Sequence, residues 1–146
     1  MTSDTDVKLA IYQTTAASGR VPTADAVAAS VGATREDVIA SFGRLAAQRL
    51  LALDRGGEAI RMAPPFSAVP TQHRVRVDGT EYFANCAWDA LGIPAALHRP
   101  AKVLSRCEQS GAPLELSVDL SGPAPSPWLF HCQVPAAGWW KDIVFT

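Results

Sequence analysis

Cys86 and Asp89 are the two residues of this sequence whose types and spacing best suit chemistry. They lie three positions apart in the stretch 82–91, which reads YFANCAWDAL. In a helix this spacing puts both side chains on one face, with their Cβ atoms about 5–6 Å apart. A soft sulfur can bind a soft metal, and a carboxylic acid can carry a proton to whatever the sulfur holds. The alternative is a half-buried structural cysteine beside an exposed aspartate, because unpaired cysteines are often buried.

The stretch 82–91 is expected to form the first turns of a helix that is entered from a strand and ended by Gly92 and Pro94. Before it, residues 73–77 alternate valines with charged or polar residues and predict a strand, which Asp78-Gly79 ends in a turn. After the helix the pattern predicts a short apolar turn at 95–97, strands at 101–105, 114–118 and 128–134, and one more helix or strand beginning within 139–146.

The first 63 residues predict three helices followed by a hairpin. Thr23 and Thr34 are expected to cap the second and third helices, and Gly32 is expected to end the second. Apolar residues on either side of the turn at 54–57 predict the hairpin. Helix, helix-turn-helix and hairpin is the order of elements in a winged-helix domain.

The expected fold class is therefore α+β, in two parts. Pro64-Pro65 marks a stiff boundary, since consecutive prolines disfavour both helix and sheet interior. Residues 1–63 are expected to form a winged-helix-like three-helix module with a hairpin. Residues 64–146 are expected to form a small mixed β-sheet domain with a helix that carries Cys86 and Asp89.

Composition excludes several classes of protein. The chain has 146 residues, of which 48% are hydrophobic and 18% charged, as in a globular protein. Its net charge of −1 argues against a general binder of polyanions. No apolar run approaches the ~20 residues of a membrane span, and the polar first six residues do not form a signal peptide. Three cysteines without zinc-finger or CxxC spacing indicate reduced thiols and a cytoplasmic location.

Residues 66–146 resemble the catalytic region of the alkylmercury lyases, also called organomercurial lyases. The likeness depends mainly on the spacing from Cys86 and Asp89 to Cys107 and Gly111, which is more specific than any of these residues alone. Further matching residues are Tyr82, Ala84, Ala87, Leu91, Pro94, Leu97, Arg99, Ala101, Val103, Ser105, Ser110, Ala112, Pro113 and Leu116.

The resemblance implies an enzyme that cleaves a carbon–mercury bond by protonolysis, releasing Hg(II) and a hydrocarbon without an organic cofactor. Cys86 would be the capturing thiolate. Its position early in a helix also predicts that it is the most reactive of the three thiols. Asp89 would be the proton carrier and a temporary mercury ligand, whereas Cys107 matches a structural cysteine and is expected to be a small buried hydrophobe. The expected partners are a small organometal substrate and a soft metal ion.

The sequence departs from the family pattern near its end. The family's second catalytic cysteine follows a segment like 140–145, and the sequence stops at Thr146, where that cysteine would come next. Cys132 is the available substitute as a metal ligand, and we expect this chain to bind mercury but to turn over poorly. A non-catalytic soft-metal or organometal binding or sensing protein is the alternative, and a winged-helix DNA-binding regulator is a third. The histidines share no ligand spacing and are expected to be non-catalytic.

We predict that the N-terminal module does not bind DNA with useful affinity. Residues 1–66 carry seven basic and seven acidic side chains, so their net charge is zero, which suits a polyphosphate poorly. Glu36 and Asp37 stand at the start of the third helix, where a recognition helix would enter the groove. Fluorescence anisotropy near physiological salt checks this. Sub-micromolar binding with a steep salt dependence would contradict it.

Overall fold

The structure is a computed structural model that describes residues 2–144. Its N-terminal part contains three helices, α1 (Asp4–Ser18), α2 (Ala24–Val31) and α3 (Arg35–Ala47). Thr23 and Thr34 cap α2 and α3 through their side-chain oxygens, and Gly32 ends α2 in the left-handed conformation. The three predicted helices and their end residues are therefore confirmed.

The strands of the described region form one antiparallel sheet. They are β1 (Ala52–Leu53), β2 (Ile60–Ala63), β3 (Phe66–Ser67), β4 (His73–Val77), β5 (Thr80–Ala84), β6 (Ala101–Arg106), β7 (Pro113–Asp119) and β8 (Gly122–Pro123). Their order is β1-β2-β3-β5-β4-β6-β7-β8, and every neighbouring pair is antiparallel. The predicted mixed sheet is wrong because β5 and β6, which run in the same direction, are separated by β4.

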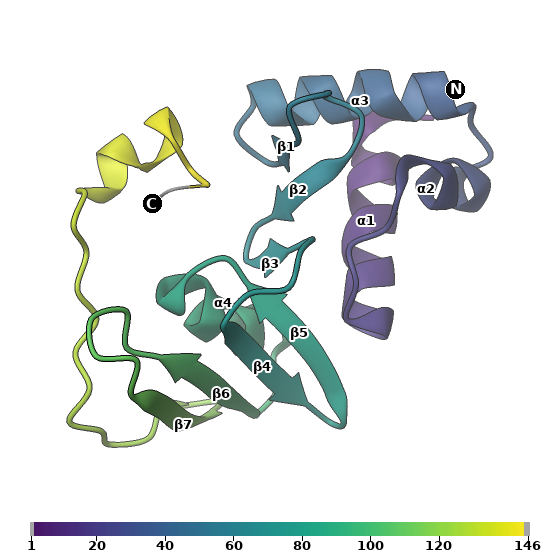
Figure 1. The fold of residues 1–146 in the computed structure, drawn as a ribbon. Coiled ribbons are helices and arrows are strands. Elements are labelled where there is room, and N and C mark those ends of the chain that lie inside the picture. Colours follow the sequence, from purple (N-terminus) through teal and green to yellow (C-terminus); the bar gives the residue numbers. More distant parts are fainter. Residues whose placement is uncertain (1, 145–146) are drawn as a thin grey trace.

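α4 (Ala87–Leu97) returns the chain between β5 and β6 and lies across strands β4 to β7 (Figure 1). Ala90 and Ile93 on its inner face are 0% exposed. Aliphatic side chains at these two positions, three apart on the helix, bury its inner face against the sheet. This contact fixes the helix, and with it the position of its first turn.

Both predicted ends of this helix are wrong. The helix does not begin at Tyr82, because Tyr82 and Phe83 pair with β4 as part of β5, where aromatic side chains are favoured. It also continues beyond Gly92 and through Pro94, giving up one backbone hydrogen bond, and absorbs the turn predicted at 95–97. It ends at His98, whose φ of 51° is left-handed.

The region after β7 differs most from its prediction. Residues 128–134, expected to form a strand, have no regular structure, because β8 and not this segment pairs with β7. Residues 136–141 form a short 3-10 helix, η1 (Ala136–Lys141), which overlaps only the start of the helix or strand expected within 139–146. The last two residues of that expected element lie outside the described part of the chain.

Two hydrophobic clusters meet along α1. One lies among α1, α2, α3 and the β1–β2 hairpin, and the other lies between α4 and the sheet. Tyr12 and Val21 pack against both, and the Tyr12 hydroxyl donates to the Pro64 carbonyl at 2.9 Å. Pro64-Pro65 forms the turn between β2 and β3, so the sheet continues across the predicted boundary. The division into domains 1–63 and 64–146 stays a prediction.

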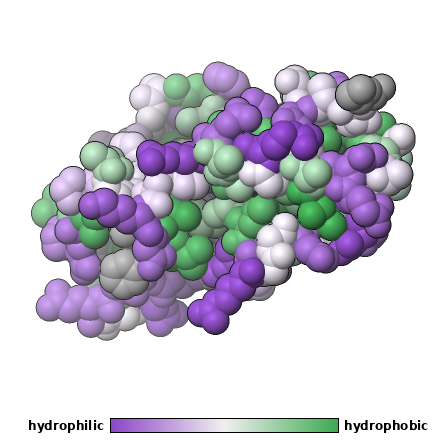
Figure 2. Space-filling model, turned by 90° about the horizontal axis from the view of Figure 1, so that it is seen from above, coloured by the Kyte–Doolittle hydropathy of each residue, from purple (hydrophilic) through white to green (hydrophobic). Residues whose placement is uncertain are grey.

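The polar and apolar side chains on the surface are distributed as expected for a globular protein of this composition. The face seen in Figure 2 carries hydrophilic side chains around several small hydrophobic patches. Within residues 2–144, no helix combines the length and the apolar character that crossing a bilayer requires.

We predict that Gly19→Ala destabilises the protein more than Gly32→Ala. Both glycines end a helix with positive φ, 75° and 67°, and left-handed strain alone costs an alanine about 1 kcal/mol. A Cβ at Gly32 meets nothing within 4 Å, whereas at Gly19 it would overlap the carbonyl oxygen of Glu81. We expect Gly19→Ala to cost a further ~1–3 kcal/mol from this overpacking. Urea unfolding measures both variants, and equal losses would contradict the packing of α1 on β5.

Candidate active site at the start of α4

The first turn of α4 brings Cys86 and Asp89 together. Cys86 is the N-cap residue, with extended backbone angles (φ −145°, ψ 177°), and its carbonyl accepts the first helical hydrogen bond from Ala90 at 3.0 Å. Asp89 is then the third helical residue. N-cap and third position are the two places whose side chains meet in a capping box, so a cysteine occupies the place that serine or threonine usually takes.

The thiol and the carboxylate share a hydrogen bond in which the thiol donates. Burial raises the pKa of Asp89 to about 6, and the bond from Cys86 partly opposes this. Burial also raises the pKa of Cys86, and the negative charge of Asp89 adds to the effect. The pair therefore holds a proton on sulfur in the resting protein, beside a carboxylate that accepts a second proton more readily than an exposed aspartate would.

The start of α4 opposes part of this effect. Cys86 makes no side-chain capping hydrogen bond of ordinary geometry, yet the backbone N–H groups of Asp89 and Trp88 lie close enough to its sulfur to lower the pKa. The positive end of the helix dipole acts in the same direction. When a soft cation replaces the proton, these N–H groups favour the sulfur anion.

Segments from the C-terminal region lie beside this turn. The Asn85 amide donates to the carbonyl of Ile143 at 3.4 Å. Trp88 meets Phe130, with ring centroids 5.6 Å apart and planes inclined at 46°. The residue before Cys86 and the residue before Asp89 thus both contact parts of the chain that follow β8.

Cys132 does not join the pair in the described region. It is exposed, and its thiol donates to the carbonyl of Val134 at 2.7 Å. Among residues 2–144 no three His, Cys, Asp or Glu side chains lie close enough together to hold one metal ion. The structure brings together two of the three predicted metal ligands, Cys86 and Asp89, and the metal-binding role of each stays a prediction.

Cys107 lies in the turn between β6 and β7. Its N–H donates to Ala112 at 2.9 Å and its carbonyl accepts from Gly111 at 2.8 Å. The pKa of its thiol is lowered, first by a hydrogen bond with the Ser110 hydroxyl and then by the N–H groups of Ser110 and Gln109. The expectation of a small buried hydrophobe is wrong, because the turn holds the sulfur among polar groups, half-exposed.

His73 is a buried polar residue that sequence spacing did not single out. It is 8% exposed, and its Nδ1 lies 2.7 Å from the hydroxyl oxygen of Ser105. Burial lowers its pKa, and Glu108, 3.9 Å from Nε2, acts in the opposite direction. It links β4 to the end of β6. An isolated histidine carries no sequence signal for such a link, because the partner comes from another strand.

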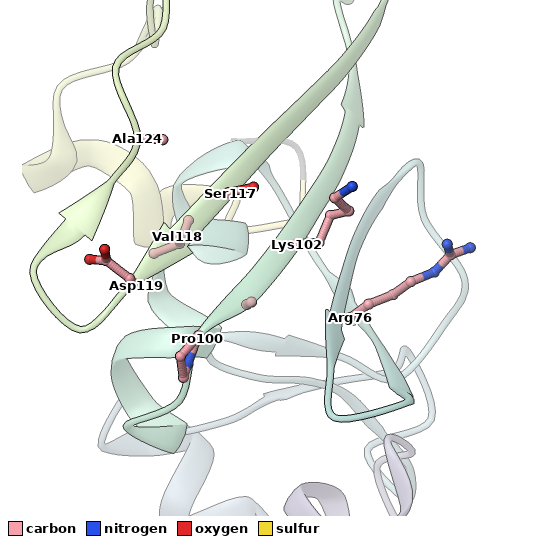
Figure 3. A pocket seen from close by; sticks show the side chains of 8 residues that line it. Arg76, Pro100, Lys102, Ser117, Val118, Asp119 and Ala124 are labelled. Carbon is pink, nitrogen blue, oxygen red and sulfur yellow. The ribbon is translucent and has the colours of Figure 1, made fainter.

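A hollow of about 410 Å³ lies on another part of the surface (Figure 3). Its lining residues are Arg76, Pro100, Ala101, Lys102, Ser117, Val118, Asp119 and Ala124. Arg76 pairs with Glu81 at 3.1 Å, and Lys102 pairs with Glu115 at 2.5 Å. Its two cations are thus neutralised within the protein, and neither Cys86 nor Asp89 lines it. We therefore place the candidate site at the start of α4.

We predict that Asp89→Asn stabilises the protein at pH 7.5. Because the folded-state pKa is raised from 3.8 to about 6, the protonated form is favoured on folding. Its stabilising contribution is complete below pH 3.8 and is lost as the pH rises through 6. After allowance for solvent screening, we expect a gain of roughly 1–2 kcal/mol at pH 7.5 that shrinks towards pH 4.

Asp119→Asn is the matched control for this effect. Hydrogen bonds from Ser121 lower the pKa of Asp119. The ionised form of Asp119 therefore stabilises the fold, and this stabilisation is lost as the pH falls. The variant should therefore be destabilising at pH 7.5 and neutral in acid, the opposite of Asp89→Asn. Urea unfolding at several pH values measures the free energy of unfolding of both variants. A pH-independent effect of Asp89→Asn would show that burial does not raise the pKa of Asp89.

We also predict that Cys107 is alkylated faster than Cys86 in the free protein. This reverses the expectation from sequence, because burial raises the Cys86 pKa whereas the turn lowers the Cys107 pKa, and the thiolate is the reacting form. Peptide mass spectrometry after timed iodoacetamide treatment at pH 7.5 gives both rates. Ser110→Ala should slow Cys107 alone. A faster reaction at Cys86 would show that its N–H contacts outweigh burial.

This chain is similar to several known proteins. The alkylmercury lyase family model matches residues 66–146. An alkylmercury lyase of Streptomyces lividans is 46% identical over 50 residues, which are 34% of this chain and 23% of that protein. One of Bacillus cereus is 33% identical over 67 residues, which are 46% and 30%. The mercury-bound form of MerB2 has a similar fold, with a TM-score of 0.63 and 22% identity over 84% of this chain and 60% of that one.

The matched segments thus span less than a third of the length of the two curated relatives. The family model nevertheless covers more than half of the 146 residues. Cys86, Asp89 and Cys107 all lie inside the matched range, the first two at the start of α4 and the third directly after β6. The chain belongs to the alkylmercury lyase family.

Proposed function

We propose that this chain captures an organomercurial on Cys86 and cleaves its carbon–mercury bond by protonolysis, with Asp89 carrying the proton. The observation that carries the proposal is the half-buried thiol–carboxylate pair at the start of α4, which holds a transferable proton between its two groups. The relatives from Streptomyces lividans and Bacillus cereus, both alkylmercury lyases, support the same assignment.

Capture exchanges one ligand of mercury for sulfur. The sulfur lone pair of Cys86 forms the S–Hg bond, the anion that accompanied R–Hg⁺ leaves, and the thiol proton passes to Asp89. The thiol already donates to that carboxylate, so the proton moves along an existing hydrogen bond. A pKa near 6 lets Asp89 accept this proton at neutral pH and release it again.

Cleavage then moves the same proton to carbon. The electron pair of the carbon–mercury bond stays with carbon and takes the proton from Asp89, and the hydrocarbon leaves. Mercury remains as Hg(II) on the Cys86 sulfur, with the Asp89 carboxylate regenerated beside it as an oxygen ligand. Backbone N–H groups near the sulfur stabilise its negative charge when the metal later departs.

We propose that the N-terminal helices and hairpin form a winged-helix-like module that supports the sheet and does not read DNA. Two arginines of α3 already have acidic partners. Arg35 pairs with Glu58 at 2.7 Å, and Arg44 pairs with Asp4 at 2.7 Å. These ion pairs reduce the charge that α3 could offer to phosphates, which agrees with the zero net charge of residues 1–66.

We propose a cytoplasmic location on chemical grounds. Capture needs Cys86 as a thiol or thiolate, and a reducing compartment keeps it so. The three cysteines of the chain are all free in the structure.

The test separates capture from cleavage. We expect peptide mass spectrometry to find an R–Hg adduct on Cys86 after incubation with phenylmercury in competition with a small soluble thiol, and gas chromatography to find slow release of benzene. Cys86→Ser should abolish both, since oxygen is a poor ligand for mercury. Asp89→Asn should keep the adduct and lose about 100-fold or more in benzene release, the usual contribution of a positioned acid. Cys132→Ser is the matched thiol control.

Each outcome has a distinct meaning. An adduct without benzene from the unaltered chain would refute the cleavage step and favour an organometal binding protein. The absence of an adduct would refute the site itself. If Cys132→Ser lost the adduct or the benzene, Cys132 would be the third ligand that the described structure does not bring near.

A further inference from the structure

Two aromatic side chains meet at the surface at the start of α4. Trp88, in the first turn of α4, is 54% exposed, and Phe130, in the irregular segment after β8, is 46% exposed. Their ring centroids are 5.6 Å apart with planes inclined at 46°, a tilted arrangement of the kind that aromatic rings favour. Roughly half of each side chain nevertheless stays open to solvent.

Core packing does not explain these rings. Neither belongs to the two hydrophobic clusters, and α4 turns Ala90 and Ile93 towards the sheet. Leu129, next to Phe130, is 92% exposed. Large apolar side chains that gather at one exposed place are a mark of a binding surface.

The position of Trp88 connects this aromatic pair with the reactive sulfur. Trp88 is two residues after Cys86, and its backbone N–H is one of the groups that lower the Cys86 pKa. In an organomercurial captured on that sulfur, the organic group is bonded to the mercury atom and so lies one atom beyond the sulfur. Side chains of the first helical turn that do not face the core are therefore the ones available to contact this group.

The chemistry of the pair selects one kind of ligand. Indole and benzene rings offer apolar surface and can pack edge to face with another ring. They therefore bind an aromatic group more tightly than a methyl group. We propose that Trp88 and Phe130 determine specificity by contacting the organic group of the captured organomercurial, with preference for aryl over methyl. This inference rests on the proposed function of Cys86.

The purely structural explanation makes a different prediction. If the ring contact only holds the segment around Phe130 against α4, its loss should weaken binding of every organomercurial equally. If the rings contact the organic group, its loss should change the ratio of affinities for two mercurials that share the same Hg–S bond. The ratio is therefore the decisive measurement.

The experiment measures capture of phenylmercury and methylmercury by the full chain, each in competition with a small soluble thiol. For the unaltered chain we expect tighter capture of phenylmercury. Trp88→Ala and Phe130→Ala should each reduce the phenyl-to-methyl affinity ratio by about threefold to tenfold, the range of one aromatic contact. Trp88→Phe should keep most of the preference, and Leu120→Ala, which removes an exposed apolar side chain between β7 and β8, should leave the ratio unchanged.

The outcomes are separable from those of the proposed function. Capture of both mercurials with a ratio that Trp88→Ala and Phe130→Ala do not alter would overturn the aromatic site and leave capture by Cys86 intact. Capture of neither by the unaltered chain would overturn both proposals. Urea unfolding of each variant verifies that the ratio was measured on folded protein.

Discussion

The burial of one face of α4 against the sheet is the contact on which the candidate site depends. Ala90 and Ile93 have no exposed surface, so the helix has little freedom to slide or rotate on β4 to β7. The first turn is therefore held in place, and Cys86 and Asp89 with it. A pair of reactive side chains needs such a support, because small changes of position weaken proton transfer and metal capture.

The same burial creates the chemistry of the pair. Water would keep Asp89 ionised and Cys86 an ordinary thiol, but partial removal of water raises the pKa of both groups. Their shared hydrogen bond lowers only the pKa of Asp89, and the N–H groups at the helix start lower only the pKa of Cys86, so each rise is opposed in part. In the proposed capture step mercury replaces the thiol proton, and the favourable bond between a soft metal and sulfur would offset the cost of holding a carboxylate in this environment.

The N-terminal helices contribute to this arrangement from a distance. α1 packs on both hydrophobic clusters through Tyr12, and the Tyr82 hydroxyl donates to the carbonyl of Ala16. Tyr82 belongs to β5, the strand that leads directly into Cys86. Phe66 stands between Tyr12 and Tyr82, with ring centroids 6.3 and 5.6 Å away. The helical module thus holds the strand that leads to Cys86.

Local patterns in the sequence were sufficient for much of the fold. Hydroxyl residues and a glycine located both ends of α2 and the start of α3, and alternation located β4, whose Val75 and Val77 are buried. The three-residue spacing of Cys86 and Asp89 was enough to predict that their side chains lie on one side of a helix. The likeness to alkylmercury lyases, which the family match bears out, also rested on residues and spacings within one stretch of the chain.

The sequence by itself determined which elements form and which side chains share a face, because periodicity, capping and turn preference act between residues near in the chain. Only the tertiary structure decided that β5 extends to Ala84, that Cys86 is the N-cap, and that Cys107 lies among polar groups. It also decided that Phe130 meets Trp88 while Cys132 stays apart from Cys86 and Asp89. These features depend on strand pairing, burial and desolvation. Such interactions form between residues that are distant in sequence, so no local sequence pattern predicts them.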